Sequence, residues 1–291
     1  FVNNLGDRPV DHYHYDEQGH LISTHYKRYW WTLDDMFKAA KDLTVKNGNT
    51  VSRFGIYNPP DDPFMTSLCG VSNGGQSFMN SIIQPTKLTV DKPYIDCARK
   101  WADAVKAGYV TPPGYPTDGL SDQFLAGQIP MFWFGQWMAP TFLTAKPGFK
   151  YGFAPMPVGA KDVQPYDAVG ICAPATIQNP DAVWKVMKFL ASDAWKTVLP
   201  KAPVAPAAHL PSSQPYFDTL KADGLSSVAD SVQYELNAKD KQGIRFTASW
   251  SAKANDILTA NWNDILQGKK ALDSTITSMV NDLTSVIQST K

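Results

Sequence analysis

The sequence has no excess of charge of either sign, because 27 lysine and arginine residues balance 27 aspartate and glutamate residues. A surface that binds nucleic acid needs a basic excess to neutralise phosphates, so the composition argues against this class of partner. A charged funnel that steers anions is equally unexpected. The sequence also lacks any apolar run near the roughly 20 residues of a membrane-spanning helix. A protein that binds a neutral ligand needs none of these features.

The sequence also lacks the short motifs of the common enzyme classes. It contains no G-x-S-x-G elbow, no H-E-x-x-H zinc motif, no glycine-rich dinucleotide fingerprint and no kinase motif set. A glycosidase needs two carboxylates that face each other across a cleft, and no such pair is recognisable at strand ends. We therefore expect a binding protein that needs no cofactor, and not an enzyme.

Histidine is rare except at the start of the chain, where four of the five histidines fall within the first 25 residues. His12 and His14 would share one face of a strand in a predicted hairpin, and His20 could approach them from the other strand. Asp11 or Asp16 could then complete a zinc site. The spacing matches no standard zinc motif, so a surface hairpin with unliganded histidines is the alternative.

Helix start and stop signals occur at several places along the chain. Thr32 and Asp35 form the pattern of a capping box, and the helix that they begin is expected to stop at Gly48. A second capped helix is predicted from Asp91 to Gly108. Between these two helices, Phe54–Tyr57 is predicted to be a strand.

The most informative stretch runs from Phe124 to Trp137. Gly127 can adopt the left-handed conformation that closes a short helix, and the apolar run from Ile129 to Phe134 has the length of a buried strand. Gly135 would end that strand, which places Trp137 beyond its carboxyl end. Ligands of open α/β sheets bind at the carboxyl ends of strands.

This stretch resembles a motif of the family 1 extracellular solute-binding proteins, which are maltose-binding-protein-like capture subunits of ABC importers for sugars. The shared spacing is F-x-x-G-x-x-x-M-x-x-x-G-x-W. Other segments are similar to family motifs in the same order: the helix Trp31–Thr44, the Pro155–Gly159 segment, Val169–Ile171 with Asn179–Lys185, and Ile265–Lys269 with Ala271–Leu272. The resemblance covers most of the chain.

The resemblance implies an α/β fold of the periplasmic-binding-protein-like (type II) class, with a mixed sheet flanked by helices. Residues 1–168 and 216–291 would form the C-terminal lobe. Residues 169–215 would be a crossing segment and a remnant of the N-terminal lobe. On the family pattern roughly a hundred residues, a typical domain size, would precede Phe1, so the chain is expected to be truncated.

The resemblance also implies the function. The protein would capture a sugar or oligosaccharide in a cleft between two lobes and deliver it to an ABC permease in the membrane. It would work outside the cytoplasm, in the periplasm or as a cell-surface lipoprotein. A carbohydrate-active hydrolase and a non-transport carbohydrate-binding or scaffold protein stay as alternatives.

Six residues are candidates for ligand binding on the family pattern. Two tryptophans would stack on sugar rings, two residues before the crossing strand would bind hydroxyls, and a glycine-rich turn would line the cleft; these are Trp137 and Trp250, Tyr166 and Asp167, and Asn73 and Gly74. Each has an ordinary structural alternative: core packing or a staple at a helix start for the tryptophans, a solvated loop for the second pair, and a tight turn for the third.

The three cysteines leave two interpretations open. Outside the cytoplasm Cys69 and Cys97 could form a disulfide, which leaves Cys172 buried and free in an apolar strand. The odd count is also compatible with three buried free thiols.

The crossing segment presents a packing problem. The apolar stretch Ile171–Ile177 and the helix Asp181–Ala191 would belong to a sheet whose other strands lie before Phe1. The apolar face of that helix, Val183, Val186, Met187 and Leu190, would then be uncovered. Such a surface usually finds a partner. We expect a swapped homodimer; a poorly ordered segment or one that folds back on its own lobe are the alternatives.

Overall fold

The computed structural model describes residues 31–57, 63–116, 120–133, 135–145, 147–167 and 169–290. The predicted histidine cluster of His12, His14 and His20 lies outside these residues. The chain divides into two compact units. The smaller unit contains Phe134–Pro155 and Ala168–Leu236, and the larger unit contains the described parts of Asn4–Trp133, Met156–Asp167 and Asn237–Lys291.

Helices dominate the larger unit, and its strands are short. The strands β1 and β2 form an antiparallel hairpin, whereas β3 and β4 pair in parallel. The helices are α1 (Leu33–Leu43), α2 (Pro63–Ser72), α3 (Lys92–Lys106), α4 (Leu120–Leu125), α10 (Ser251–Leu266) and α11 (Leu272–Ser289). The strands are β1 (Val45–Asn47), β2 (Thr50–Arg53), β3 (Val163–Tyr166) and β4 (Asp240–Gly243).

The predicted capping box at the start of α1 is confirmed. The Thr32 hydroxyl accepts a hydrogen bond from the Asp35 amide at 3.1 Å, and the Asp35 carboxylate accepts one from the Thr32 amide at 3.0 Å. The predicted stop at Gly48 is wrong, because α1 ends at Leu43 and the chain continues into the β1–β2 hairpin. Gly48 has a positive φ of 61° within that hairpin, so it supplies a strand turn and not a helix end.

The helix α3 packs one face into the core of the larger unit. Asp91 caps it, since its carboxylate accepts a hydrogen bond from the Tyr94 amide at 3.1 Å. Trp101 lies on the inner face of α3, and its ring meets that of Phe37 edge to face at 4.7 Å. The buried face of α3 comprises Tyr94, Cys97, Ala98, Trp101, Ala104 and Val105.

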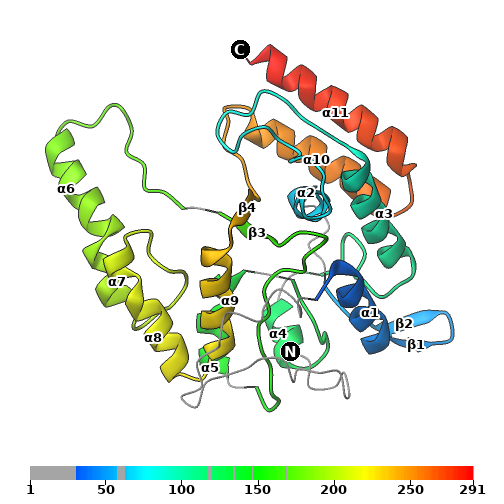
Figure 1. Cartoon of the computed structure of the whole chain (residues 1–291), viewed down its shortest axis with the longest axis horizontal. Coiled ribbons are helices and arrows are strands. Elements are labelled where there is room, and N and C mark those ends of the chain that lie inside the picture. The colour runs from blue at the N-terminus through cyan, green and yellow to red at the C-terminus, as the bar shows by residue number, and fades with distance from the viewer. Residues whose placement is uncertain are drawn as a thin grey trace. The chain divides into compact units, whose positions relative to one another are not determined.

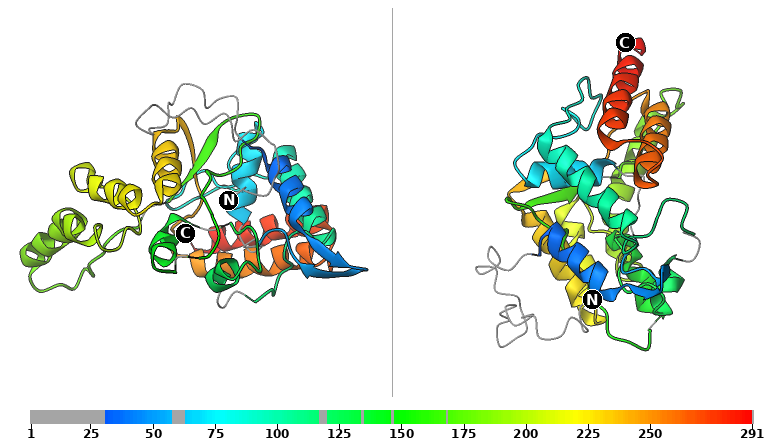
Figure 2. Two further views of the ribbon diagram at one scale, coloured as in Figure 1. Left: turned by 90° about the horizontal axis from the view of Figure 1, so that it is seen from below. Right: turned by 90° about the vertical axis from the view of Figure 1, so that its right-hand side faces the viewer.

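The two C-terminal helices lie side by side in both views (Figures 1 and 2), and their facing sides supply another part of the core. Gly268, with a φ of 68°, turns the chain between them. The buried side chains include Leu258 and Trp262 of α10, and Ile276, Met279 and Leu283 of α11.

The predicted strand Ile129–Phe134 is not a regular strand in the part that the structure describes. A single parallel bridge joins Phe132 to Tyr57, supported by a hydrogen bond from the Tyr57 amide to the Met131 carbonyl at 2.9 Å. Pro130 has no amide proton and cannot contribute to a ladder. The prediction for Gly127 is confirmed, because it follows α4 with a φ of 73° and its amide bonds back to the Phe124 carbonyl.

The smaller unit is helical in its described residues, and its core lies around α8 and α9. Tyr216 and Leu220 of α8 and Ala229 of α9 are fully buried. Ser227 and Ser231 of α9 hold the extended segment around Phe153 through its amide and carbonyl. The elements are η2 (Gln136–Met138), α5 (Ala139–Ala145), α6 (Pro180–Ala191), α7 (Asp193–Val198), η3 (Leu210–Ser212), α8 (Gln214–Ala222) and α9 (Ser226–Asn237).

The helices α6 and α7 pack against each other, and neither contains a buried residue. Val186 and Leu190 are exposed, and Val183 and Met187 are only half-buried, as expected for an uncovered face. The expectation of a buried Cys172 is wrong, because its thiol belongs to an exposed stretch that forms no strand. The homodimer stays a prediction.

The two units divide the chain at other points than the lobes expected from the sequence. Residues 135–155 and 216–236 group with 169–215, rather than with the expected C-terminal lobe of 1–168 and 216–291. The assignment of either unit to a particular lobe of the family fold stays a prediction.

Candidate functional site

Two of the predicted residues, Tyr166 and Asp167, lie at the carboxyl end of β3, where the parallel strand β4 also ends. The strands run parallel in the register Val163 with Asp240 through Tyr166 with Gly243, so both end at the same side (Figure 1). Tyr166 is the last residue of β3 and is 39% exposed. A hydrogen bond from the Ile244 amide to the Tyr166 carbonyl, at 3.2 Å, extends the pairing beyond β4.

Asp167 follows directly and forms an ion pair with Arg245, with 2.8 Å between the carboxylate Oδ2 and the guanidinium Nε. The Asp167 side chain is 38% exposed and the Arg245 side chain 65% exposed. Arg245 was not among the residues predicted from the sequence. No local sequence signal identifies it, because the pairing of β3 with β4 is what brings Arg245 to Asp167.

Trp137 lies in the smaller unit, in the 3-10 turn η2 just before α5, and is 45% exposed. Gly135 comes immediately before this turn. A side chain at Gly135 would overlap the Trp137 ring, so the glycine lets the indole fold back over the backbone. The arrangement presents a partly exposed aromatic face, as the ligand hypothesis requires. Its role in binding stays a prediction.

Trp250 lies at the N-terminal end of α10 in the larger unit and is only 6% exposed. Its ring packs on that of Phe246, with 5.1 Å between the centroids and an angle of 32° between the planes. This contact accounts for the burial of the ring, and a role of Trp250 in ligand binding stays a prediction. Stacking on a sugar would require that a ligand reach a ring that the protein already covers.

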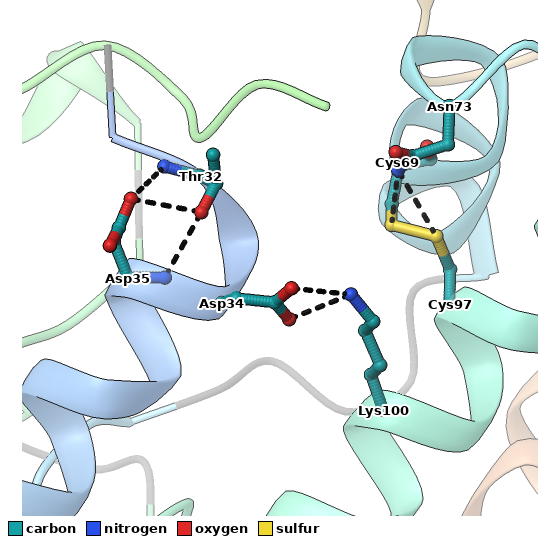
Figure 3. A network of polar contacts seen from close by, with 7 residues as sticks. All are labelled: Thr32, Asp34, Asp35, Cys69, Asn73, Cys97 and Lys100. Carbon is teal, nitrogen blue, oxygen red and sulfur yellow. Dashed lines mark hydrogen bonds and ion pairs between the residues drawn. A yellow bond between two sulfur atoms is a disulfide. The ribbon is translucent and has the colours of Figure 1, made fainter. Parts of the chain in front are cut away.

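The turn of Asn73 and Gly74 closes the C-terminal end of α2. The Asn73 side-chain amide Nδ2 donates a hydrogen bond to the Cys69 carbonyl at 2.9 Å and lies 3.7 and 3.9 Å from the sulfurs of Cys69 and Cys97 (Figure 3). Gly74 has a φ of 90° and open space around it. These contacts account for both residues as parts of a tight turn, and a role in ligand binding stays a prediction.

The disulfide between Cys69 and Cys97 is present, which decides between the two interpretations of the cysteines (Figure 3). It joins α2 to α3, and the ion pair between Asp34 and Lys100, at 2.7 Å, joins α1 to α3 from another side. The turn at Asn73 is thus held on a rigid group of helices.

The described residues contain no group of three or more histidine, cysteine, aspartate or glutamate side chains that could hold a metal ion. None of the described helices is long and apolar enough to cross a membrane.

Several solved solute-binding proteins have similar structures. The ABC substrate-binding protein Lmo0181 from Listeria monocytogenes, in complex with cycloalternan, matches with a TM-score of 0.72 and 20% identity, over 89% of this chain and 64% of its own. The maltose/maltodextrin-binding domain MalE from Bdellovibrio bacteriovorus, bound to maltotriose, matches with a TM-score of 0.66 and 15% identity, over 90% of this chain and 67% of its own.

A third relative is the cyclic alpha-maltosyl-1,6-maltose binding protein from Arthrobacter globiformis, with a TM-score of 0.65 and 14% identity, over 90% of this chain and 65% of its own. These likenesses confirm the expected type II periplasmic-binding-protein-like fold. The chain spans less than two thirds of the length of the Listeria protein.

Comparison with curated proteins gave no match. The model of a family described as bacterial extracellular solute-binding protein matches residues 19–197, which is more than half of the chain. The match includes the segment Phe124–Trp137, on which the resemblance was first based. The chain belongs to the family of bacterial extracellular solute-binding proteins.

Proposed function

We propose that this chain belongs to the substrate-binding component of an ABC importer, which captures a sugar or oligosaccharide outside the cytoplasm and delivers it to a membrane permease. The observation that carries the proposal is the family match over residues 19–197. Proteins of similar fold are bound to cycloalternan and maltotriose, which are neutral oligosaccharides. The balanced charge of this chain suits such a ligand.

Each unit contains exposed candidate side chains with the chemistry that sugars require. Tyr166 of the larger unit and Trp137 of the smaller unit each present an aromatic face, of the kind that packs against the apolar faces of sugar rings. Asp167 supplies a carboxylate that can accept hydrogen bonds from hydroxyl groups, and charge-assisted hydrogen bonds are the stronger kind. Small-molecule sites combine aromatic walls with a few polar groups, and in the larger unit Tyr166 and Asp167 supply one of each.

A hydrolase is the less favoured alternative. A glycosidase requires two carboxyl groups that flank the bond to be cleaved. Asp167 is the single carboxylate among the six candidate residues, and its side chain is paired with Arg245. Binding without turnover is therefore the function that these residues support best.

Titration with maltotriose and with cycloalternan tests the proposal. A binder shows a higher melting temperature as the sugar concentration rises, and the sugar is recovered unchanged. The proposal is wrong if neither sugar, at millimolar concentration, changes the melting temperature or the protein NMR spectrum. Hydrolysis products in the recovered sugar would favour the hydrolase instead.

Substitution of Trp137 tests its proposed stacking role. Trp137→Ala should weaken maltotriose binding by about 1–3 kcal/mol, the scale of a lost aromatic contact. Trp184→Ala is the matched control, because Trp184 is a more exposed tryptophan of the same unit outside the candidate site. Equal affinity of the two variants, measured by calorimetry, would contradict the role of Trp137.

A further inference from the structure

The carboxyl ends of β3 and β4 form a small platform in the larger unit, which we define by Tyr166, Asp167, Gly243 and Arg245. Tyr166 and Gly243 are opposite each other in the last register position of the two strands. Asp167 and Arg245 leave the strands on the same side and meet at 2.8 Å. Parallel strands direct their carboxyl ends to one side, which is where α/β proteins bind ligands.

Gly243 shapes this platform. A side chain at Gly243 would overlap Ile82, and its first carbon would lie 3.4 Å from the Tyr166 hydroxyl. The missing side chain therefore makes room for Ile82, and the Tyr166 phenol lies at an ordinary contact distance from this position of β4. The ends of the two strands thus carry an aromatic side chain that is 39% exposed and an ion pair that is itself accessible.

The ion pair is held by the strand pairing and not by a helix. The hydrogen bond from Ile244 to Tyr166, at 3.2 Å, fixes the backbone that leads to Arg245. Beyond Arg245, the Thr247 amide bonds to the Ile82 carbonyl at 2.8 Å. Arg245 therefore projects from a segment anchored on both sides. Such anchoring lowers the conformational entropy that a ligand contact would otherwise cost.

We propose that Arg245 is a further ligand-binding residue and that it acts together with Asp167 on adjacent hydroxyl groups of one sugar ring. The inference rests on the proposed function. The Nε of Arg245 faces Asp167, and about two thirds of the side chain stays exposed. The guanidinium group offers five N–H donors in a plane, so donors beyond Nε are available to a ligand.

A paired guanidinium and carboxylate matches the chemistry of a sugar diol. A hydroxyl group both donates and accepts hydrogen bonds, so Asp167 can accept from one hydroxyl while Arg245 donates to its neighbour. The pair is neutral overall, so it selects an uncharged oligosaccharide over a sugar acid or a sugar phosphate. Tyr166 would cover one face of the same ring.

The experiment uses the arginine Nε–H signals of the whole chain in an NMR titration with maltotriose. We expect the Arg245 signal, assigned by its loss in Arg245→Lys, to shift with the ligand concentration. The Arg99 signal is the internal control. Arg99 forms an exposed ion pair with Asp273 at 3.0 Å, far from the strand ends in sequence. Its signal should not move.

Affinities of matched variants provide the second readout. Arg245→Ala should raise the dissociation constant for maltotriose by on the order of tenfold, as expected for the loss of a charge-assisted hydrogen bond. Arg99→Ala should leave it unchanged. Arg245→Lys keeps the charge opposite Asp167 but loses the planar fork, so its melting temperature should be that of the parent while its affinity falls.

The outcomes separate this inference from the proposed function. If the parent chain binds neither maltotriose nor cycloalternan, the proposed function is wrong and the inference is overturned with it. If the parent binds maltotriose while the Arg245 signal stays fixed and Arg245→Ala binds equally well, only the role of Arg245 is overturned. A lower melting temperature of Arg245→Ala with unchanged affinity would show a purely structural ion pair and would also overturn it.

Discussion

The helices α3 and α6 begin in nearly the same way and end in different surroundings. Each has a capping side chain, Asp91 or Asn179, that accepts a hydrogen bond from a backbone amide three residues later. Each has a proline in its first turn and an apolar side. The apolar side of α3 is buried against α1, α2 and the C-terminal helices, whereas no residue of α6 is buried.

The comparison separates the properties of a helix that depend on neighbouring residues from those that depend on distant parts of the chain. Capping and periodicity involve residues three or four positions apart, so they act wherever the helix lies. What covers the apolar side depends on distant parts of the chain. The Val186 and Leu190 side chains on the apolar side of α6 are exposed within the described structure. An exposed apolar side of this kind is a surface on which a partner, such as a second copy, would bury area.

The largest expected effect comes from equal substitutions in the two helices. Trp101→Ala in α3 should lower the free energy of unfolding by about 3–5 kcal/mol, because Trp101 is 2% exposed and its removal leaves a cavity. Trp184→Ala in α6 should change it by less than about 0.5 kcal/mol, because Trp184 is 63% exposed. Urea denaturation of both variants measures the difference.

The stability of Trp184→Ala also tests whether a partner covers α6 in solution. A loss of stability near that of Trp101→Ala would mean that something covers α6 in solution. If that loss also grew on dilution of the protein, the cover would be a second copy, since the stability of a dimer depends on its concentration.

The disulfide provides the next largest effect. Cys69 and Cys97 are separated by 28 positions and tie α2 to α3. The double variant Cys69→Ser, Cys97→Ser should lower the free energy of unfolding by about 3 kcal/mol, because the unfolded chain regains the entropy of the open loop. Cys172→Ser, at an exposed position in the smaller unit, should have almost no effect.

Thermal unfolding with and without a reducing agent checks this prediction. Reduction should lower the melting temperature of the parent and of Cys172→Ser, but not that of the double variant. Equal melting temperatures of the oxidised and reduced parent would show that the disulfide does not constrain the fold.

The features that could be predicted from the sequence are those with local causes. The capping box at Thr32, the cap at Asp91 and the left-handed Gly127 each depend on a few neighbouring residues, and each is confirmed. The strand expected at Ile129–Phe134 depends on a partner elsewhere in the chain, and it is reduced to one bridge to Tyr57.

The candidate site shows the same limit. Tyr166 and Asp167 were identified from their position before a crossing strand. Arg245 was missed, because only the parallel pairing of β3 with β4 brings it to Asp167 from 78 positions away. The place of Trp250 before a helix can be read from the sequence, but its contact with Phe246 cannot.

A smaller change in stability is expected from a buried hydroxyl group in the packed part of the smaller unit. The Tyr216 hydroxyl of α8 is buried, and no hydrogen-bond partner is found for it among the described residues. Tyr216→Phe should therefore raise the free energy of unfolding by about 1 kcal/mol near neutral pH. Tyr166→Phe is the control, since Tyr166 is much more exposed.

The same substitution changes the response to alkaline pH. Burial, and then the negative charge of Glu235, raise the pKa of Tyr216 well above its ordinary value near 10. The unfolded chain therefore ionises first, so stability is complete below about pH 10 and falls as the pH rises above it. Tyr216→Phe should lose less stability between pH 9 and about pH 11 than the parent. An equal loss in both proteins would contradict the raised pKa.

The smallest change in stability is expected from substitutions of the N-cap residues of α3 and α6. Asp91→Ala should lower the free energy of global unfolding by about 1 kcal/mol, because α3 is part of the core and loses the hydrogen bond to the Tyr94 amide. Asn179→Ala removes an equivalent hydrogen bond, to the Ala182 amide at 3.0 Å, from α6, which contains no buried residue. Its effect should be confined to faster hydrogen exchange in the first turns of α6, with global stability unchanged. If both substitutions lowered global stability equally, α6 would unfold together with the core, and its exposed side would have to be covered in solution.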